Sequence, residues 1–137
     1  MIDLHCHILP GIDDGAIDLA DSVEMARQAA ADGIEKVCAT PHIRHDHDVR
    51  IHELPSRVAA VNEALTAAGL PVEVLSGGEV AETAVDGLDR SELEAVSLGG
   101  AGWILLEPAP GPLSDSLAAT ADYLIGEGFG VLIAHPE

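Results

Sequence analysis

The sequence predicts an α/β domain with parallel strands. Short apolar runs of strand period alternate with alanine-rich stretches of helical period along all 137 residues, which is typical of βαβ units with right-handed crossovers. The predicted strands are almost continuously apolar, as expected when helices cover both faces of a sheet. Aromatic residues make up only 2% of the chain, so aliphatic side chains must build the core. We therefore expect a single domain over residues 1–137.

The first half of the chain is expected to run strand, helix, strand, loop, helix. The first helix begins at Asp18 or Asp21, where a carboxylate can cap free amides, and ends near Gly33. The second helix places apolar residues on one face and ends at Gly69. The other elements expected here are strands at 1–7 and 34–39, a polar, histidine-rich loop at 40–54, and the second helix itself at 55–68.

The second half repeats the alternation. Pro71 opens the third strand, and the pair Gly77–Gly78 follows it. The expected elements are strands at 72–76, 103–106 and 130–134, a short helical turn at 91–96, and a helix at 113–125. Together with the first half, this gives five strands.

The chain is strongly acidic. Six Lys and Arg residues against 24 Asp and Glu residues give a formal net charge of −18, which repels nucleic-acid phosphates and anionic lipid. We therefore expect neither nucleic acid nor a membrane as a partner. Cys6 and Cys38 are too few for a disulfide scaffold, and the N-terminus has no basic start followed by a long apolar run. We expect a cytoplasmic protein with both thiols reduced and packed as small hydrophobic side chains.

A histidine or a glutamate stands at the end of every predicted strand. The carboxyl ends of parallel strands meet at one face, where binding and catalytic groups collect. His5 and His7 are two residues apart on an extended segment, so their side chains project to the same side with Cα atoms about 7 Å apart. One such residue is ordinary, but five such strand ends predict a shared site for Zn²⁺, Mn²⁺ or Fe²⁺. The residues are His5, His7, His42, Glu79, Glu107 and His135.

The loop after His7 offers a further carboxylate. Asp13 and Asp14 precede Gly15 in a short, turn-rich segment. One interpretation is an Asx turn that leads into the first helix. The other is that Asp14 turns back into the site as an additional metal ligand. The residues alone leave both interpretations open.

Five motifs together resemble the polymerase and histidinol phosphatase (PHP) superfamily and, within it, the bacterial capsule-associated manganese-dependent protein-tyrosine phosphatases. The match spans the whole chain with almost the family's own spacing, and the opening block is highly specific. The motifs are MIDLHCHILPGIDDGA at 1–16, ATPH at 39–42, GGE at 77–79, LLE at 105–107 and AHPE at 134–137.

This resemblance implies a distorted (β/α)7 barrel that holds up to three divalent metal ions. Mn²⁺ is the ion that the resemblance favours, with Fe²⁺ or Zn²⁺ as alternatives. The implied ligand sets are His5, His7 and a bridging Glu79 for the first ion, Glu79, Glu107 and His135 for the second, and Asp14 and His42 for the third.

The chain also departs from the family's pattern. The family has a late Asp-x-His pair, and an Arg that contacts phosphate directly after the His-Pro-Glu motif, whereas this sequence stops at Glu137. About five βα units are present, fewer than a closed barrel needs. We expect the domain to be incomplete at its C-terminal end, and the first and last strand edges to be open to pairing in an oligomer.

A second departure follows His42. Where the family tends to have another histidine, Ile43 stands here, and Arg44, His45 and His47 follow. These residues either replace the missing histidine in a mobile loop or form a solvated loop with adventitious metal affinity. Arg44 is the residue that we nominate for substrate binding.

The function implied is metal-dependent hydrolysis of phosphomonoesters, with protein phosphotyrosine on a bacterial tyrosine kinase of capsule or exopolysaccharide synthesis as the substrate. Three divalent ions would bring six positive charges against the carboxylates of Asp14, Glu79 and Glu107, so the site would attract the phosphate that the surface repels. A metal-bound hydroxide would be the nucleophile, so we expect no catalytic side chain beyond the metal ligands. Cys6 lacks the Cys-x5-Arg cradle of cysteine phosphatases.

Three alternatives stay open. A phosphatase of a small substrate such as histidinol phosphate would use the same metal site. An amidohydrolase often uses a bridging lysine on a later strand, but the only lysine, Lys36, stands at the start of the second strand. The third alternative is a truncated, non-catalytic fragment that binds metal.

Overall fold

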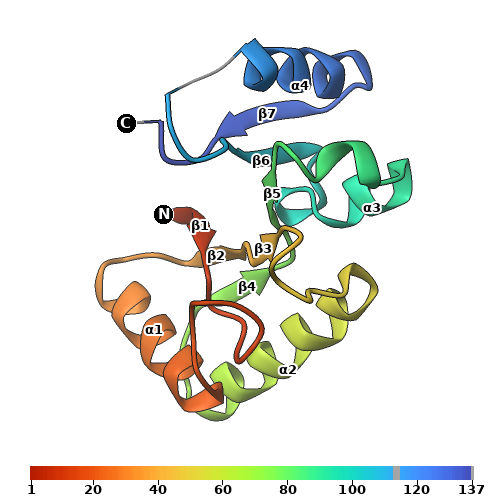
Figure 1. Cartoon of the computed structure of the whole chain (residues 1–137). Coiled ribbons are helices and arrows are strands. Elements are labelled where there is room, and N and C mark those ends of the chain that lie inside the picture. The colour runs from red at the N-terminus through yellow and green to blue at the C-terminus, as the bar shows by residue number, and fades with distance from the viewer. Residues whose placement is uncertain (113–114, 137) are drawn as a thin grey trace.

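The computed structural model describes residues 1–112 and 115–136. Every strand pair in this part of the chain is parallel, and α-helices connect several of the strands, which confirms the predicted α/β class (Figure 1). The strands are β1 (Ile2–Cys6), β2 (Lys36–Ala39), β3 (His42–Ile43), β4 (Glu73–Leu75), β5 (Glu79–Ala81), β6 (Trp103–Glu107) and β7 (Gly130–Ile133). The α-helices are α1 (Leu19–Ala31), α2 (Leu54–Ala67), α3 (Arg90–Ala95) and α4 (Asp115–Gly126).

The strands form two sheets, in the orders β1-β2-β4 and β3-β5-β6-β7. Only residues 40–41 separate β2 from β3, and only residues 76–78 separate β4 from β5, so the chain passes twice from the first sheet to the second. Pro41 has no N–H to donate to a ladder, which suits a break between strands. At Gly78 a side chain would press against Ile43 and Val96, so the second crossing requires glycine.

Two predictions about these crossings are wrong. Residues 40–54 are not entirely loop, because they contain β3 and a 3-10 turn at Ile51–Glu53. Glu79 begins a strand of its own instead of following the third strand. Both short strands exist because His42 pairs with Glu79 in parallel register, and β5 continues this pairing to β6. The five predicted strands are all present, with slightly different ends.

The helix starts depend on local capping. The Asp18 carboxylate accepts hydrogen bonds from the backbone N–H groups of Ala20 and Asp21, which identifies Asp18 as the N-cap of α1. Of the helix predicted at 113–125, residues 113 and 114 lie outside the described residues, and α4 is described from Asp115 onward.

Two apolar clusters support the site. The larger contains residues of strands and of helices, among them Val37, Leu65 and Leu106. The smaller joins the two sheets, because it contains Cys38 of β2 and Leu105 of β6. Cys38 is 2% exposed, and the partly buried Cys6 packs against the larger cluster, so both cysteines are packed as predicted.

The outer edges of β1 and β7 pair with no further strand among the described residues. Leu4, Trp103 and Leu132 are exposed nearby and, with Leu98 and Ala101, line a groove of about 290 Å³. The second sheet and the α4 layer stand beside the first sheet with its two helices, as Figure 1 shows. No helix in residues 1–112 or 115–136 has the length and hydropathy of a membrane span.

Candidate metal centre

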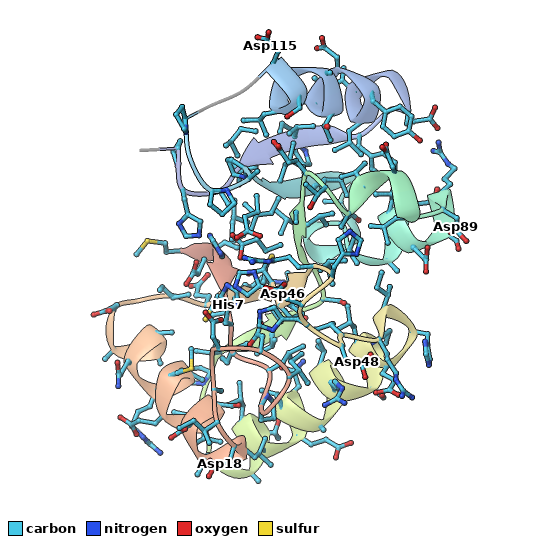
Figure 2. All side chains as sticks on the ribbon, in the orientation of Figure 1. His7, Asp18, Asp46, Asp48, Asp89 and Asp115 are labelled. Carbon is cyan, nitrogen blue, oxygen red and sulfur yellow. The ribbon has the colours of Figure 1, made fainter. Side chains whose placement is uncertain are left out.

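The residues predicted as metal ligands converge between the two sheets. Figure 2 shows His7 near the middle of the molecule, whereas Asp18, Asp89 and Asp115 lie at its periphery. Each strand that borders the centre supplies one or two of these side chains. They are His5 and His7 from β1 and its end, His42 from β3, Glu79 from β5, Glu107 from β6, His135 after β7, and Asp14 from the loop between β1 and α1.

Glu79 is the centre of this arrangement. Its side chain is 0% exposed, yet neither carboxylate oxygen has a hydrogen-bond partner of good geometry. Four imidazoles surround it. Oε2 lies 3.3 Å from His5 Nε2, 3.2 Å from His7 Nε2 and 3.1 Å from His42 Nδ1, and Oε1 lies 3.2 Å from His135 Nε2.

This donor set fits divalent cations. A buried carboxylate without good hydrogen bonds is costly unless a cation balances it. Two ligand atoms that are each about 2.1 Å from one ion and about 100° apart lie about 3.2 Å from each other, which matches the spacing around Glu79. The residues that the structure describes contain three groups of clustered donor atoms: His5, His7 and Glu79; His7, Asp14 and His42; and His42, Glu79 and Glu107.

One of these groups repeats an expected ligand set, and the other two overlap the expected sets in part. The first group is the set expected for the first ion. The third places His42, and not His135, with Glu79 and Glu107, because His42 Nδ1 is 3.7 Å from Glu107 Oε2. The assignment of individual ligands to individual ions therefore stays a prediction.

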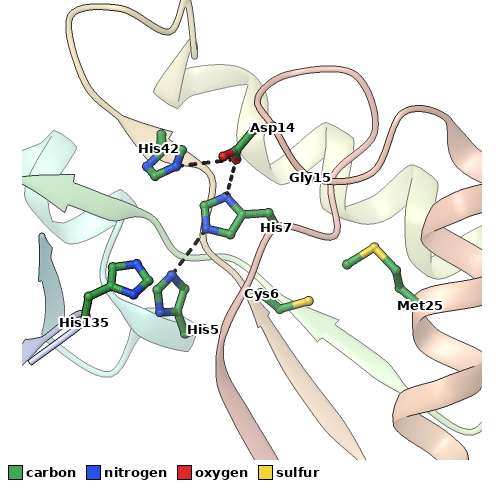
Figure 3. Close-up of a pocket in the computed structure, with 8 residues that line it drawn as sticks. All are labelled: His5, Cys6, His7, Asp14, Gly15, Met25, His42 and His135. Carbon is green, nitrogen blue, oxygen red and sulfur yellow. Dashed lines mark hydrogen bonds and ion pairs between the residues drawn. The ribbon is translucent and has the colours of Figure 1, made fainter. Parts of the chain in front are cut away.

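Asp14 faces the imidazoles from the outer side of the centre. Its Oδ1 lies 3.6 Å from His7 Nδ1 and 3.5 Å from His42 Nε2, as the dashed lines in Figure 3 indicate. Its side chain is 72% exposed, so surrounding side chains do not block its access to a cation. The geometry supports the interpretation of Asp14 as a residue directed into the site.

Asp13 is a site residue that the sequence analysis missed. Its side chain is 1% exposed, and its Oδ1 accepts a hydrogen bond from the backbone N–H of Gly15, which is the Asx turn that the sequence suggests. Its Oδ2, however, lies 2.8 Å from His7 Nδ1 and also accepts from the backbone N–H of His42. The only sequence signal was the Asx turn itself, which engages one oxygen and leaves the other available to contact His7 and His42.

Gly15 holds this loop against the site. An added side chain would overlap the backbone carbonyl and the Cβ of His7. Only glycine therefore allows the loop to return over His7 and bring the two aspartates back toward the imidazoles.

His135 reaches Glu79 through an unusual backbone. Its φ is +47°, the only positive φ at a non-glycine residue within the described part of the chain. This left-handed conformation costs about 1–3 kcal/mol for an ordinary residue and is typical of functional sites. The imidazole is 59% exposed and its ring lies 5.1 Å from that of His5, so this side of the centre is open to solvent.

Arg44 connects the histidine-rich loop to the centre. Its Nη1 donates to Glu107 Oε1 at 3.0 Å, while Nε and Nη2 donate to the two carboxylate oxygens of Asp46. His47 stacks on His42 with ring centroids 5.0 Å apart, and His45 Nε2 lies 3.3 Å from the Thr83 carbonyl oxygen. Neither His45 nor His47 joins a donor cluster in the part of the chain that the structure describes.

Neighbouring groups raise the pKa of His7 and lower the pKa of Glu79. Burial alone would lower the pKa of His7, but its hydrogen bond to Asp13 and its close contact with the Glu79 carboxylate outweigh that effect and raise this pKa to about 10. Burial opposes ionisation of Glu79, yet His7 and the neighbouring imidazoles hold the pKa of this carboxyl below its usual value. Both shifts show that the surroundings of His7 and Glu79 favour positive charge beside this carboxylate.

The open side of the centre is a pocket of about 520 Å³. Figure 3 shows its imidazoles directed toward one another, while the Cys6 side chain turns away toward Met25. Burial, with Asp3 and Asp13 nearby, raises the pKa of Cys6 to about 11, so its thiol is a poor nucleophile. The orientation and the pKa both agree with the expectation that cysteine chemistry is not used.

The whole chain matches a known protein family. Residues 1–137 match the family described as "Capsular polysaccharide synthesis, CpsB/CapC". The sequence is 40% identical over 144 residues to the tyrosine-protein phosphatase YwqE of Bacillus subtilis, and 25% identical over 144 residues to the putative tyrosine-protein phosphatase CapC of Staphylococcus aureus. Each alignment covers 100% of this chain and 54% of the relative, so the chain spans about half the length of these curated relatives.

The fold has a solved counterpart. A chain from the crystal structures of YwqE from Bacillus subtilis and CpsB from Streptococcus pneumoniae, described as unique metal-dependent tyrosine phosphatases, superposes with a TM-score of 0.82 at 34% identity. The superposition covers 99% of this chain and 56% of that one. The resemblance inferred from the motifs is thereby confirmed.

Proposed function

The chain belongs to the CpsB/CapC family of capsular polysaccharide synthesis, and we propose that it carries the metal centre of a metal-dependent protein-tyrosine phosphatase. The observation that supports this most directly is Glu79, a fully buried carboxylate with four imidazoles at 3.1–3.3 Å. Relatives that are named tyrosine-protein phosphatases support the substrate class. The expected protein partner is a phosphotyrosine-bearing bacterial kinase of capsule or exopolysaccharide synthesis, and a cytoplasmic location stays a prediction.

The centre would hold up to three divalent cations, with Mn²⁺ preferred over Fe²⁺ or Zn²⁺. When bound, such cations supply a Lewis acid for phosphoryl oxygens and activate water at neutral pH. The proposed ligands are His5, His7, Asp14, His42, Glu79, Glu107 and His135. Of these, Glu79 lies deepest and orients the imidazoles around it, whereas Asp14 and His135 lie at the solvent boundary where a substrate arrives.

Arg44 is the proposed substrate-binding side chain. Its guanidinium reaches the centre through Glu107 and is held from the other side by Asp46, so it stands at the rim without entering the imidazole cluster. A planar guanidinium binds phosphate through paired hydrogen bonds. In a chain of net charge −18, this is one of few fixed positive charges available to a phosphate at the centre.

The openness of the centre favours a phosphate carried on a protein surface. Asp14 and His135 are largely exposed, and the pocket between them is broad. A tyrosine phosphate projects about as far as a long side chain and can enter such a shallow site without unfolding of its own protein. A small substrate such as histidinol phosphate would find few enclosing side chains here.

The experiment is a comparison of substrates with and without metal. The purified protein is stripped with a chelator, reloaded with Mn²⁺, and assayed on a phosphotyrosine peptide, a phosphoserine peptide and histidinol phosphate. We expect hydrolysis of the phosphotyrosine peptide only after Mn²⁺ is restored. Full activity in excess chelator would refute the metal centre, and a preference for histidinol phosphate would refute the substrate class.

We also propose that the two sheets are parts of one distorted (β/α)7 barrel that the described strands leave open between β1 and β7. The chain crosses between the sheets twice, and Cys38 and Leu105 pack from opposite sheets. The apolar groove along Leu4 and Trp103 and the unpaired strand edges make this chain, on its own, prone to pair with a second copy. Sedimentation should show a mass that rises with concentration, and a monomer at every concentration would contradict self-association.

A further inference from the structure

The neighbouring carboxylates of Asp13 and Asp14 differ in burial and in what they contact. Asp14 is 72% exposed and faces the imidazoles from outside, whereas Asp13 is 1% exposed and has both oxygens engaged by the protein. Oδ1 of Asp13 accepts from the Gly15 N–H at 3.1 Å, and Oδ2 accepts from the His42 N–H at 3.1 Å and contacts His7 Nδ1 at 2.8 Å. With all these contacts, Asp13 has no oxygen directed at the centre itself.

The contact with His7 selects one ring nitrogen. A carboxylate accepts hydrogen bonds only, so the close contact requires the proton to be on Nδ1 of His7. The unshared electron pair of the neutral ring is then on Nε2, which lies 3.2 Å from Glu79 Oε2 and 3.3 Å from His5 Nε2. The nitrogen that must bind a cation is therefore the one that faces the other donor atoms.

The same oxygen also ties two elements together. His7 follows β1, and His42 begins β3, which belongs to the other sheet. Because Oδ2 of Asp13 bonds the ring of His7 and the backbone of His42, it fixes the orientation of one proposed ligand relative to the strand that carries another. Orienting partners of this kind strengthen metal binding without touching the ion.

We propose that Asp13 is a positioning residue that holds His7 in the Nδ1–H form with its plane directed at Glu79. The inference rests on the proposed metal centre. Asp13 is not a ligand in this scheme, and its loss leaves all seven proposed ligands in the chain. It differs in this respect from Asp14, whose carboxylate the scheme assigns to the cation.

The test measures Mn²⁺ affinity by calorimetry in Asp13→Asn, Asp13→Ala and the control Asp122→Asn. Asp122 is exposed on α4, and its substitution removes one negative charge far from the imidazoles. We expect affinity to fall about 10- to 100-fold in Asp13→Ala, by less in Asp13→Asn, whose carbonyl oxygen can still accept from His7 Nδ1, and not at all in Asp122→Asn. Thermal melts of the metal-free variants show whether each is folded.

A second readout separates positioning from simple loss of charge or of the turn. In the Zn²⁺-loaded protein, the ¹⁵N shifts of His7 report which ring nitrogen binds metal. We expect Nε2 ligation with Nδ1–H in the wild type and in Asp13→Asn, and a mixture or reversal in Asp13→Ala. Unchanged His7 shifts in a folded Asp13→Ala protein would overturn the inference. A wild-type protein that binds neither ion would instead overturn the proposed function, so the two failures are distinguishable.

Discussion

The two sides of the metal centre are built differently. On the side of β1 and β3, His7 and His42 are largely buried and are joined by the hydrogen bonds of Asp13. On the side of β7, His135 is mostly exposed and stands in a left-handed backbone conformation. Protein hydrogen bonds hold the first side in place, whereas the second side is open to solvent. Glu79 belongs to both, because one oxygen faces each side.

Removing the shared carboxylate should produce the largest effect. Glu79→Gln keeps the shape of the side chain but removes the charge that four imidazoles surround. We expect Mn²⁺ affinity to fall by more than about 100-fold, above the range for an orienting partner. Calorimetric titration checks this, and a variant that still binds with wild-type affinity would show that the two sides do not share a ligand.

A substitution at Gly15, in the loop that returns over His7, should destabilise the β1 and β3 side of the centre selectively. In Gly15→Ala the new methyl group meets the backbone of His7, so we expect a loss of about 1–3 kcal/mol in the free energy of unfolding of the metal-free protein. Gly87→Ala is the matched control, because nothing lies within 4 Å of its added Cβ. Chemical denaturation compares the two, and equal midpoints would mean that the loop is less rigid than its contacts indicate.

Matched histidine substitutions test the contrast directly. His7→Asn breaks the contact with buried Asp13 and should cost the metal-free protein about 1–3 kcal/mol. His135→Asn removes an exposed imidazole beside Glu79 Oε1, and asparagine tolerates the left-handed backbone, so the loss of metal-free stability should be smaller than in His7→Asn. Both should weaken Mn²⁺ binding. Equal losses of metal-free stability would remove the distinction between the two sides.

The smallest effect is expected for a substitution of Arg44, at the edge of the centre. Arg44→Ala removes the guanidinium that contacts Glu107 but removes no proposed ligand. We expect KM for a phosphotyrosine peptide to rise several-fold while Mn²⁺ affinity holds or improves, since Glu107 loses a competing cation. Steady-state kinetics at saturating Mn²⁺ measures this. A fall in metal affinity without a change in KM would assign Arg44 to the structure of the centre instead of to the substrate.

Sequence reasoning located the centre better than it described the strands around it. The chemical type and spacing of His5, His7 and Glu107 suffice to predict a shared site, because parallel strands end at one face. The same reasoning could not show that His42 and Glu79 begin new strands in a second sheet, since a two-residue strand has no period to detect.

Two further features lay beyond sequence reasoning for physical reasons. Asp13 and Asp14 are chemically identical, and only the path of the loop decides which is buried against His7 and which faces the imidazoles. The left-handed backbone of His135 likewise has no signature in a histidine followed by proline. Both are consequences of tertiary contacts that no local pattern encodes.

The pairing of His42 with Glu79 restricts how this part of the gene can change length. Side chains alternate across a strand, so the number of residues decides which face a side chain takes. One residue inserted before His42 within 40–43 would turn His42 to the opposite face, and one inserted before Glu79 within 76–80 would turn Glu79. The loop that follows β3 carries no such constraint on its way to the 3-10 turn at Ile51–Glu53. Insertions and deletions should therefore accumulate among homologues after residue 47 and be absent from the two crossings, where the number of residues matters as much as their identity.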